Sequence, residues 1–362
     1  MKYLITVLAG LALQFSIAQV EQVKRIEIED ATDVYQFGDK GVVVLDREFE
    51  RGSDYTEWVL TFYDTDLNES GRETIHLDKK MLFDEDYKSE DHLYLFFTTK
   101  KKEYVVIKVN PENNSFEEIK GRIPPKCYVS DMVAVDNIAY FRGYIKRKHY
   151  MFTINLETGQ QNPIPISIEG IDTKKGKITD LQVLDEEDEA IVYLSKYQKR
   201  LADDKIAAIY DVSGDKKEII NLSQNEENEL LNVSASPLKG DGYIWSGTYG
   251  IGRSKISNGI FFGASSEGKM DFVNYFPYSD LTEFLKFLPE KKQAKIEKKK
   301  AKKKARGKEF KISYRMAAHD IIKKEDGYIL IGEAYYPTYR TETYTTTSVV
   351  NGVSTTLSLI HI

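Results

Sequence analysis

The sequence predicts an all-β protein built from a repeated four-stranded unit. Short apolar segments alternate with clusters of Gly, Asn, Asp and Pro along most of the 362 residues, as strands and tight turns do. An Asp followed by an apolar residue opens five of these units, and the first four openings are 45 to 53 residues apart. Because four strands in about 45–50 residues is the size of a propeller blade, we expect a β-propeller with about six four-stranded blades.

Each unit is expected to begin with a short strand that carries the recurring acidic residue. The opening residues are Asp33, Asp86, Asp131, Asp180 and Asp320, while the fifth unit has Ser234 or Ser236 at this place. Apolar second strands are expected at residues 42–44, 93–96, 138–141, 191–194, 243–245 and 328–330. The second half of each unit is a hairpin, with turns expected at 64–71, 110–114, 155–159, 211–215 and 264–268.

In blade length and strand order, residues 29 to 356 resemble exported β-propeller proteins of the Bacteroidota type. The resemblance implies the fold and no particular activity. Neither a WD dipeptide nor a kelch double glycine marks a subfamily. The composition, which is 41% hydrophobic with one Cys, excludes a disordered chain, a disulfide scaffold and a polytopic membrane protein.

The first 18 residues have the pattern of a secretory signal. Lys2 precedes a short apolar run at residues 3–13, and Ser16 and Ala18 place small residues before a cleavage site. This run is too short to span a bilayer, which takes about 20 residues. We therefore expect residues 19–356 to form an exported propeller-like domain, in the periplasm or outside the cell, with no transmembrane segment.

The last six residues, 357–362, are expected to be non-native. Their sequence matches the translated end of a sequencing adaptor and follows a hairpin signal at Asn351 and Gly352. We expect native sequence to end near Thr356, in a sixth unit that consists of residues 310–336 and a hairpin at 339–356. The parent protein would then have seven or eight blades.

Residues 278–309 interrupt the strand pattern and are expected to form a helical insertion. From Asp280 to Leu288, apolar residues recur at helical spacing, and Pro289 is expected to end that helix. The segment 291–308 then contains eleven Lys or Arg residues and a single acid. The candidate binding residues of this basic arm are Lys298, Lys299, Lys300, Lys302, Lys303, Lys304 and Arg306.

The basic arm contrasts with the rest of the chain, because the whole sequence carries a net charge of −6. Clustered lysines attract anionic lipid headgroups and acidic glycans. The alternatives are a solvated helix that binds nothing and a helix that docks on the acidic body. Nucleic acid is not expected as a partner, because the arm lacks interleaved aromatic residues for base stacking.

The recurring acidic residues Asp33, Asp86, Asp131, Asp180 and Asp320 are the first candidate binding set. Equivalent positions of successive blades form a ring, in which crowded carboxylates could hold a cation or raise one another's pKa. The alternative is that each Asp accepts local hydrogen bonds at its blade junction. A second candidate surface comprises Tyr335, Tyr336, Tyr339 and Arg340, an aromatic stretch suited to sugars or peptides.

The sequence contains no H-E-x-x-H, C-x-x-C, G-x-S-x-G or Walker motif, so it predicts no catalytic residues, no metal and no cofactor. The leading hypothesis is an exported, non-enzymatic binding or scaffold propeller that recognises a macromolecular or glycan partner. The first alternative is a secreted glycan-active hydrolase or lyase that uses carboxylates at the propeller mouth. The second is an envelope-associated protein that docks to anionic surfaces through its basic arm.

Overall fold

The computed structural model describes residues 32–361, apart from 49–51, 165–175, 199–201, 226, 239–241, 253, 282, 287, 309, 326, 336–341 and 351–352. From residue 342 on, only the backbone is described. The predicted signal segment therefore lies outside the described residues, as do Tyr336, Tyr339 and Arg340. The chain divides into two compact units, residues 1–165 (unit 1) and residues 166–362 (unit 2).

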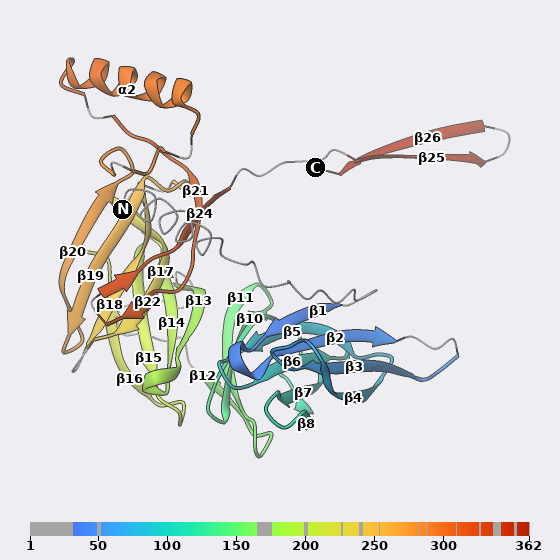
Figure 1. Cartoon of the computed structure of the whole chain (residues 1–362). Helices are drawn as coiled ribbons and strands as arrows, with labels where there is room; N and C mark the ends of the chain where they lie inside the picture. The colour runs from blue at the N-terminus through green and yellow to red at the C-terminus, as the bar shows by residue number, and fades with distance from the viewer. Residues whose placement is uncertain are drawn as a thin grey trace, which may run out of the picture. The chain divides into compact units, whose positions relative to one another are not determined.

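Unit 1 contains three four-stranded antiparallel sheets, each with its strands in sequence order (Figure 1). The first sheet consists of β1 (Asp33–Gln36), β2 (Val42–Glu48), β3 (Tyr55–Tyr63) and β4 (Glu69–Asp78). The second consists of β5 (Leu82–Lys88), β6 (Leu93–Thr98), β7 (Glu103–Asn110) and β8 (Ser115–Arg122). The third consists of β9 (Cys127–Val135), β10 (Ile138–Ile145), β11 (Lys148–Asn155) and β12 (Gln161–Ile164).

The sheets of unit 1 pack face to face through the middle sheet. Alternate side chains of a strand point to opposite faces, and every residue of β6 is buried. Leu93, Leu95 and Phe97 join the core shared with the first sheet. Tyr94 and Phe96 join the core shared with the third sheet. A strand buried on both faces is what a propeller blade between two neighbours requires.

Unit 2 contains two more sheets of the same kind. The fourth sheet consists of β13 (Gly176–Leu184), β14 (Glu189–Lys196), β15 (Asp204–Tyr210) and β16 (Lys216–Asn221). The fifth consists of β17 (Asn228–Pro237), β18 (Tyr243–Ile251), β19 (Gly259–Ser266) and β20 (Lys269–Pro277). Their shared core is centred on Trp245, which is fully buried and whose indole N–H donates to the Ser265 hydroxyl over 2.7 Å.

The predicted sixth unit forms paired strands rather than one four-stranded sheet. β21 (Arg315–Ala318) pairs with β24 (Gly332–Tyr335), and β22 (Ile322–Lys324) pairs with β23 (Gly327–Ile329). A separate hairpin follows, formed by β25 (Glu342–Val350) and β26 (Val353–His361). Val350 pairs with Val353, and residues 357–361 continue β26. The predicted turn residues Asn351 and Gly352 lie outside the described residues.

The insertion contains a helix, but in a different place from the one predicted between Asp280 and Leu288. Hydrogen bonds between residues three apart make successive turns there, for example from the Phe284 amide to the Leu281 carbonyl. Helix α2 (Glu290–Lys304) begins directly after Pro289. Proline suits a helix start because its missing N–H would have no partner within the first turn. Pro289 therefore begins a helix instead of ending one.

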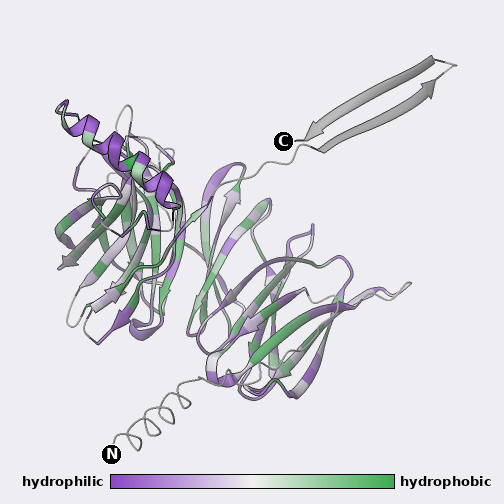
Figure 2. Cartoon of the chain, turned by 45° about the horizontal axis from the view of Figure 1, so that its top comes forward, coloured by the Kyte–Doolittle hydropathy of each residue, from purple (hydrophilic) through white to green (hydrophobic). Residues whose placement is uncertain are grey.

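The five four-stranded sheets, their sequential strand order and their face-to-face packing make this an all-β chain of the β-propeller class with a Lys-rich helical insertion. Figure 2 shows the contrast between the parts: apolar residues alternate along the strands, whereas α2 is almost wholly hydrophilic. No helix within the described residues is both long and apolar enough to cross a membrane.

Candidate functional site

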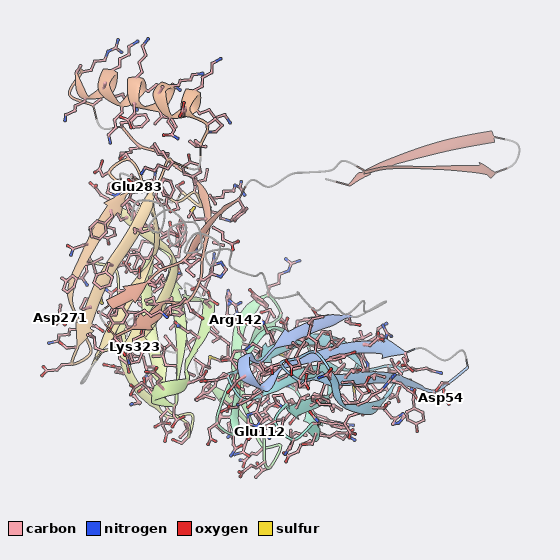
Figure 3. All side chains as sticks on the ribbon, viewed as in Figure 1. Asp54, Glu112, Arg142, Asp271, Glu283 and Lys323 are labelled. Carbon is pink, nitrogen blue, oxygen red and sulfur yellow. The ribbon has the colours of Figure 1, made fainter. Side chains whose placement is uncertain are left out.

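Of the three predicted acidic residues of unit 1, two lie near each other and the third forms an ion pair with an arginine. Asp86 lies near Asp33 and the Tyr35 hydroxyl. Burial raises the pKa of the Asp86 carboxyl, and the Asp33 charge raises it further. Asp131 instead forms an ion pair of 2.9 Å with Arg142, which is labelled in Figure 3. Asp131 is thus paired with a basic residue of its own sheet.

The strand register shows that Asp86 and Asp131 are not equivalent positions. A β-bulge interrupts the first strand of the second to fifth sheets. The residue directly after the bulge is Glu85, Asp131, Asp180 and Asn232, respectively. Sequence spacing selected Asp86 instead of Glu85, because spacing alone does not show where a bulge shifts the register by one residue. The two acids are adjacent in β5, so their side chains point to opposite faces of the sheet.

Glu85 is therefore a residue that the sequence analysis missed. Burial raises the pKa of its carboxyl, and the charge of Asp131 raises it further, whereas Arg142 acts in the opposite direction. The position after the bulge thus carries an acid in three successive sheets and an amide in the fifth. In the fifth sheet, Asn232 donates to the Thr248 hydroxyl and to the Met316 carbonyl, each over 3.1 Å.

In unit 2, Asp180 of β13 lies near a buried lysine on β15, which is two strands away in the fourth sheet. Lys205 is 6% exposed, and its Nζ donates to the Thr179 hydroxyl over 3.1 Å. Burial lowers the pKa of Lys205 to about 8, although the charges of Asp180, Glu229 and Asp203 oppose that shift. The charges that act on Lys205 thus come from β13, from β17 of the fifth sheet and from the residue just before β15.

Asp320 is exposed, and its carboxylate is hydrogen-bonded to a polar network that is buried in unit 2. Its carboxylate accepts a hydrogen bond of 3.1 Å from Ser234, one of the two serines predicted for the place of Asp in the fifth repeat. Ser234 also accepts from the Gln182 amide over 3.2 Å. The Tyr193 hydroxyl donates to the Gln182 carbonyl over 2.6 Å, and so does the Ala235 amide over 2.9 Å. These hydrogen bonds join the fourth sheet, the fifth sheet and the segment that contains Asp320.

The other predicted surfaces are exposed. Tyr335 lies in β24 and is 50% exposed; the rest of its aromatic stretch is outside the described residues. The predicted basic residues Lys298, Lys299, Lys300, Lys302, Lys303 and Lys304 lie in α2, and Arg306 follows it. Apart from Lys300, which is half-buried, they are exposed.

A cavity of unit 2 lies where four hairpin ends of the fourth and fifth sheets meet. It has a volume of about 310 Å³. Its lining comprises Glu187, Glu189, Lys217, Glu218, Pro237, Gly242, Tyr243 and residues 265–268. We call it the glutamate pocket. The lining residues come from strand ends that are up to 81 positions apart in the sequence.

Tight turns bring these strand ends together. Glu267 and Gly268 form the turn between β19 and β20 with φ of 48° and 72°, the left-handed region that a two-residue hairpin needs. Gly242 has a φ of 149°, and a Cβ there would lie 2.3 Å from the Ser265 carbonyl oxygen. Only glycine permits this close approach of the β17–β18 connection to β19.

Two glutamates with different surroundings face the pocket. Glu189 is 3% exposed; its carboxylate pairs with the Lys217 ammonium and accepts a hydrogen bond of 2.7 Å from the Tyr243 hydroxyl. Burial raises the pKa of Glu218, and repulsion by Glu189 raises it further. The Lys217 charge and the Gly268 amide partly offset this rise. Glu218 therefore keeps a proton to higher pH than an ordinary glutamate.

The sequence analysis missed all four of these polar residues, Glu189, Lys217, Glu218 and Tyr243. They come from three strands, with Lys217 and Glu218 adjacent in β16, and no recognised motif surrounds any of them. Glu189, directly before an otherwise apolar strand, was the one available signal. Among the described residues, no group of three or more His, Cys, Asp or Glu side chains is placed to hold a metal ion.

The fold and this site together define a β-propeller protein with a charged pocket at the strand ends of two adjacent sheets. No protein-family model matches the chain, and no curated protein matches it. Solved structures similar to it include cobalt-substituted apocarotenoid oxygenase from Synechocystis, with 6% identity and a TM-score of 0.39 over 65% of this chain and 61% of that one.

Two other similar structures are a prolyl endopeptidase and the Dos1 propeller. The first has 9% identity and a TM-score of 0.40, covering 66% of this chain and 34% of that chain. The second has 10% identity and a TM-score of 0.36, covering 64% and 58%. This chain spans about three fifths of the oxygenase structures it matches. Likenesses this distant transfer no activity to it.

Proposed function

We propose that the chain is an exported, non-enzymatic β-propeller that binds a macromolecular partner, with a glycan as the favoured ligand, through the glutamate pocket. The observation that carries this proposal is the pocket itself, which combines acceptors from Glu189 and Glu218 with donors from Lys217 and Tyr243. Ligand sites have volumes of about 300–1,000 Å³. A pocket at the lower limit accepts one terminal group, such as a single sugar residue.

Hydroxyl groups of a sugar suit this lining, because each can donate to a carboxylate and accept from an ammonium group. The pocket is partly bounded by the Tyr243 side chain, which offers an apolar ring face and a polar hydroxyl. The Lys217 side chain is 49% exposed, so it can reach a bound group without leaving Glu189. These features favour recognition of a polyhydroxylated ligand.

The test is isothermal titration of the purified chain with a panel of neutral and acidic oligosaccharides. We expect at least one to bind and Glu218→Gln to weaken that binding about tenfold or more, as loss of a charged hydrogen bond does. Glu112→Gln, an exposed change in unit 1, is the matched control and should bind as wild type. Absence of binding across the panel, or equal binding by Glu218→Gln, would overturn the glycan assignment.

A second candidate function is glycan cleavage, and the unequal glutamates favour it. Glycosidases use one protonated and one ionised carboxyl group; Glu218, with its raised pKa, fits the first role and Glu189 fits the second. Release of reducing ends from an oligosaccharide that binds, and its loss in Glu218→Gln, would establish this function. Binding without turnover over a day would support the binding module.

A further inference from the structure

The insertion of unit 2 is fixed to the fifth sheet at both of its ends. The Tyr278 ring stacks on Phe284 at 4.3 Å between centroids, and Tyr314 meets Phe284 edge-on at 5.4 Å. Tyr278 is 1% exposed, and its hydroxyl lies 2.7 Å from the Ser257 hydroxyl. Ser257 also pairs through its backbone with Tyr314. The chain therefore leaves and returns to the sheet through one packed aromatic stem.

One side of α2 points back towards this stem. The Gln293 amide donates to the Leu288 carbonyl over 2.6 Å, and the Lys300 ammonium donates to the Ser279 carbonyl. Ile296 lies between them on the same side and is half-buried. These three are the least exposed residues of a helix that has no buried residue. The contacts fix which side of the helix faces outward.

The opposite side carries a row of lysines. Lys291, Lys295, Lys298 and Lys302 are spaced i, i+4, i+7 and i+11, which places them along one line on a helix with 3.6 residues per turn. All four are exposed. At 1.5 Å per residue, the row is about 16 Å long. In Figure 3, side chains extend from α2 into open space away from the sheets of unit 2.

Two more lysines widen the row into a face. Lys292 and Lys299 lie on one flank of it, whereas both acids of the helix, Glu290 and Glu297, lie on the other flank. Lys303 is not part of it, because its ammonium lies 5.8 Å from the centroid of the Phe310 ring. Ala294 and Ala301 border the row on the second flank, so no large apolar side chain lies there. The outward side of α2 is therefore broad, cationic and without an apolar stripe. We call these six lysines the lysine face.

We propose that the lysine face docks unit 2 on an anionic lipid bilayer, with α2 parallel to the membrane surface. A broad cationic arc on a fixed stem complements a plane of negative headgroups. A neutral sugar chain carries no negative charge to match this face, and nucleic acid would need aromatic side chains for stacking. Without an apolar stripe, α2 stays at the headgroups, so the binding is electrostatic throughout.

The test is co-sedimentation of the purified chain with phosphatidylcholine vesicles that contain 0 to 40% phosphatidylglycerol, at low salt. We expect binding to rise steeply with the anionic lipid. Each lysine near a surface strengthens binding by about fivefold, so K291Q/K295Q/K298Q/K302Q should weaken it about 100- to 1,000-fold. Raising the salt about tenfold should release the wild type, because the attraction is screened.

The control changes the same amount of charge elsewhere. K79Q/K80Q/K100Q/K101Q removes four exposed lysines from unit 1 and should bind vesicles as the wild type does. Equal loss in both variants would show that only net charge matters and would overturn the proposal. So would binding that survives high salt or needs no anionic lipid. Retention on a soluble acidic polysaccharide without vesicle binding would replace the membrane by a glycan as the partner of this face.

Discussion

The two units are built from the same four-stranded sheets but join them differently. In unit 1, the buried polar side chains among the described residues, tyrosines aside, are threonines only, namely Thr56, Thr98, Thr99 and Thr153. In unit 2, the corresponding set includes charged and amide groups: Gln182, Glu189, Ser195, Lys205, Ser234, Ser236, Ser246, Thr248, Ser257 and Ser265. The apolar cores of unit 1 fix the fold, and the polar junctions of unit 2 accompany the pocket and the helix.

This difference shows how a repeated fold carries chemistry. A blade junction made only of apolar side chains tolerates little variation, because each lost methylene group costs stability. A junction with polar groups must satisfy each of them, which fixes their geometry. We therefore expect the residues that bind a ligand to lie in unit 2. The following substitutions test whether the sheet junctions of the two units differ in this way.

The largest effect is expected in the apolar junction of unit 1. Phe96 is fully buried and contacts the Phe141 ring at 4.7 Å between centroids. Phe96→Ala should lower the free energy of unfolding by about 3–5 kcal/mol, because it leaves a cavity between two sheets. Urea denaturation measures this loss. Phe272→Ala, the same change at a side chain that is 42% exposed, should cost much less; equal costs would contradict an apolar junction.

The next effect concerns the buried lysine of unit 2 and depends on pH. The pKa of Lys205 is about 8 in the folded chain and 10.5 ordinarily. Between these values the unfolded chain binds more protons, so the free energy of unfolding rises with pH. The penalty is fully present below pH 8 and is relieved as pH rises to 10.5. Its full size is about 3 kcal/mol.

Lys205→Met isolates this contribution. The variant lacks the titrating group, so the wild type should gain stability relative to it between pH 8 and 10. Urea denaturation at several pH values gives the difference, in which the titration of the many tyrosines cancels. Lys177→Met, at an exposed position of β13, should run parallel to the wild type. A constant difference between wild type and Lys205→Met would show that Lys205 is charged in the folded chain.

A smaller effect is expected from the polar network around Gln182. Its carbonyl accepts from both the Tyr193 hydroxyl and the Ala235 amide. Tyr193→Phe and Gln182→Ala should each destabilise unit 2, and a double-mutant cycle should give a coupling of about 1–2 kcal/mol. Additive losses would mean that the two side chains act independently. Tyr104→Phe, whose hydroxyl has a backbone acceptor in unit 1, is the control for loss of a buried hydroxyl.

The strands were predictable because their signals are local. Val42–Val44 and Leu93–Phe96 have the composition of buried strands, and the turn residues at 110–114 and 155–159 separate the hairpins. Five sheets follow these signals. The helix start was wrong because Phe284, counted as part of an apolar helix face, packs instead on Tyr278 and Tyr314. That contact joins distant residues and leaves no local pattern.

The candidate site was less predictable, for two physical reasons. A single bulged residue, Asp84, moves the equivalent acid from Asp86 to Glu85, and no composition signal marks a bulge. The glutamate pocket depends on the packing of two sheets, which brings Glu189, Glu218 and Tyr243 together from three strands. Repetition identified the blade positions that build the fold, whereas the pocket residues occur once each and so escaped a search for repeats.

The smallest effect links the turn chemistry of unit 2 to its pocket. Gly268 has a φ of 72°, and a Cβ there would lie 3.4 Å from a Glu218 carboxylate oxygen, an ordinary contact. Gly268→Ala should therefore cost about 1–2 kcal/mol through the left-handed backbone alone. Gly214→Ala has the same backbone cost at a φ of 82°, with no atom within 4 Å of the added group.

Thermal unfolding should show similar losses of stability for the two variants. Oligosaccharide titration should separate them, because the Gly268 amide is hydrogen-bonded to Glu218 and any shift of this turn changes the charge presented to a ligand. We expect weaker binding by Gly268→Ala and unchanged binding by Gly214→Ala. If both variants bind as the wild type does, the turn between β19 and β20 only closes a hairpin, and the pocket does not depend on it.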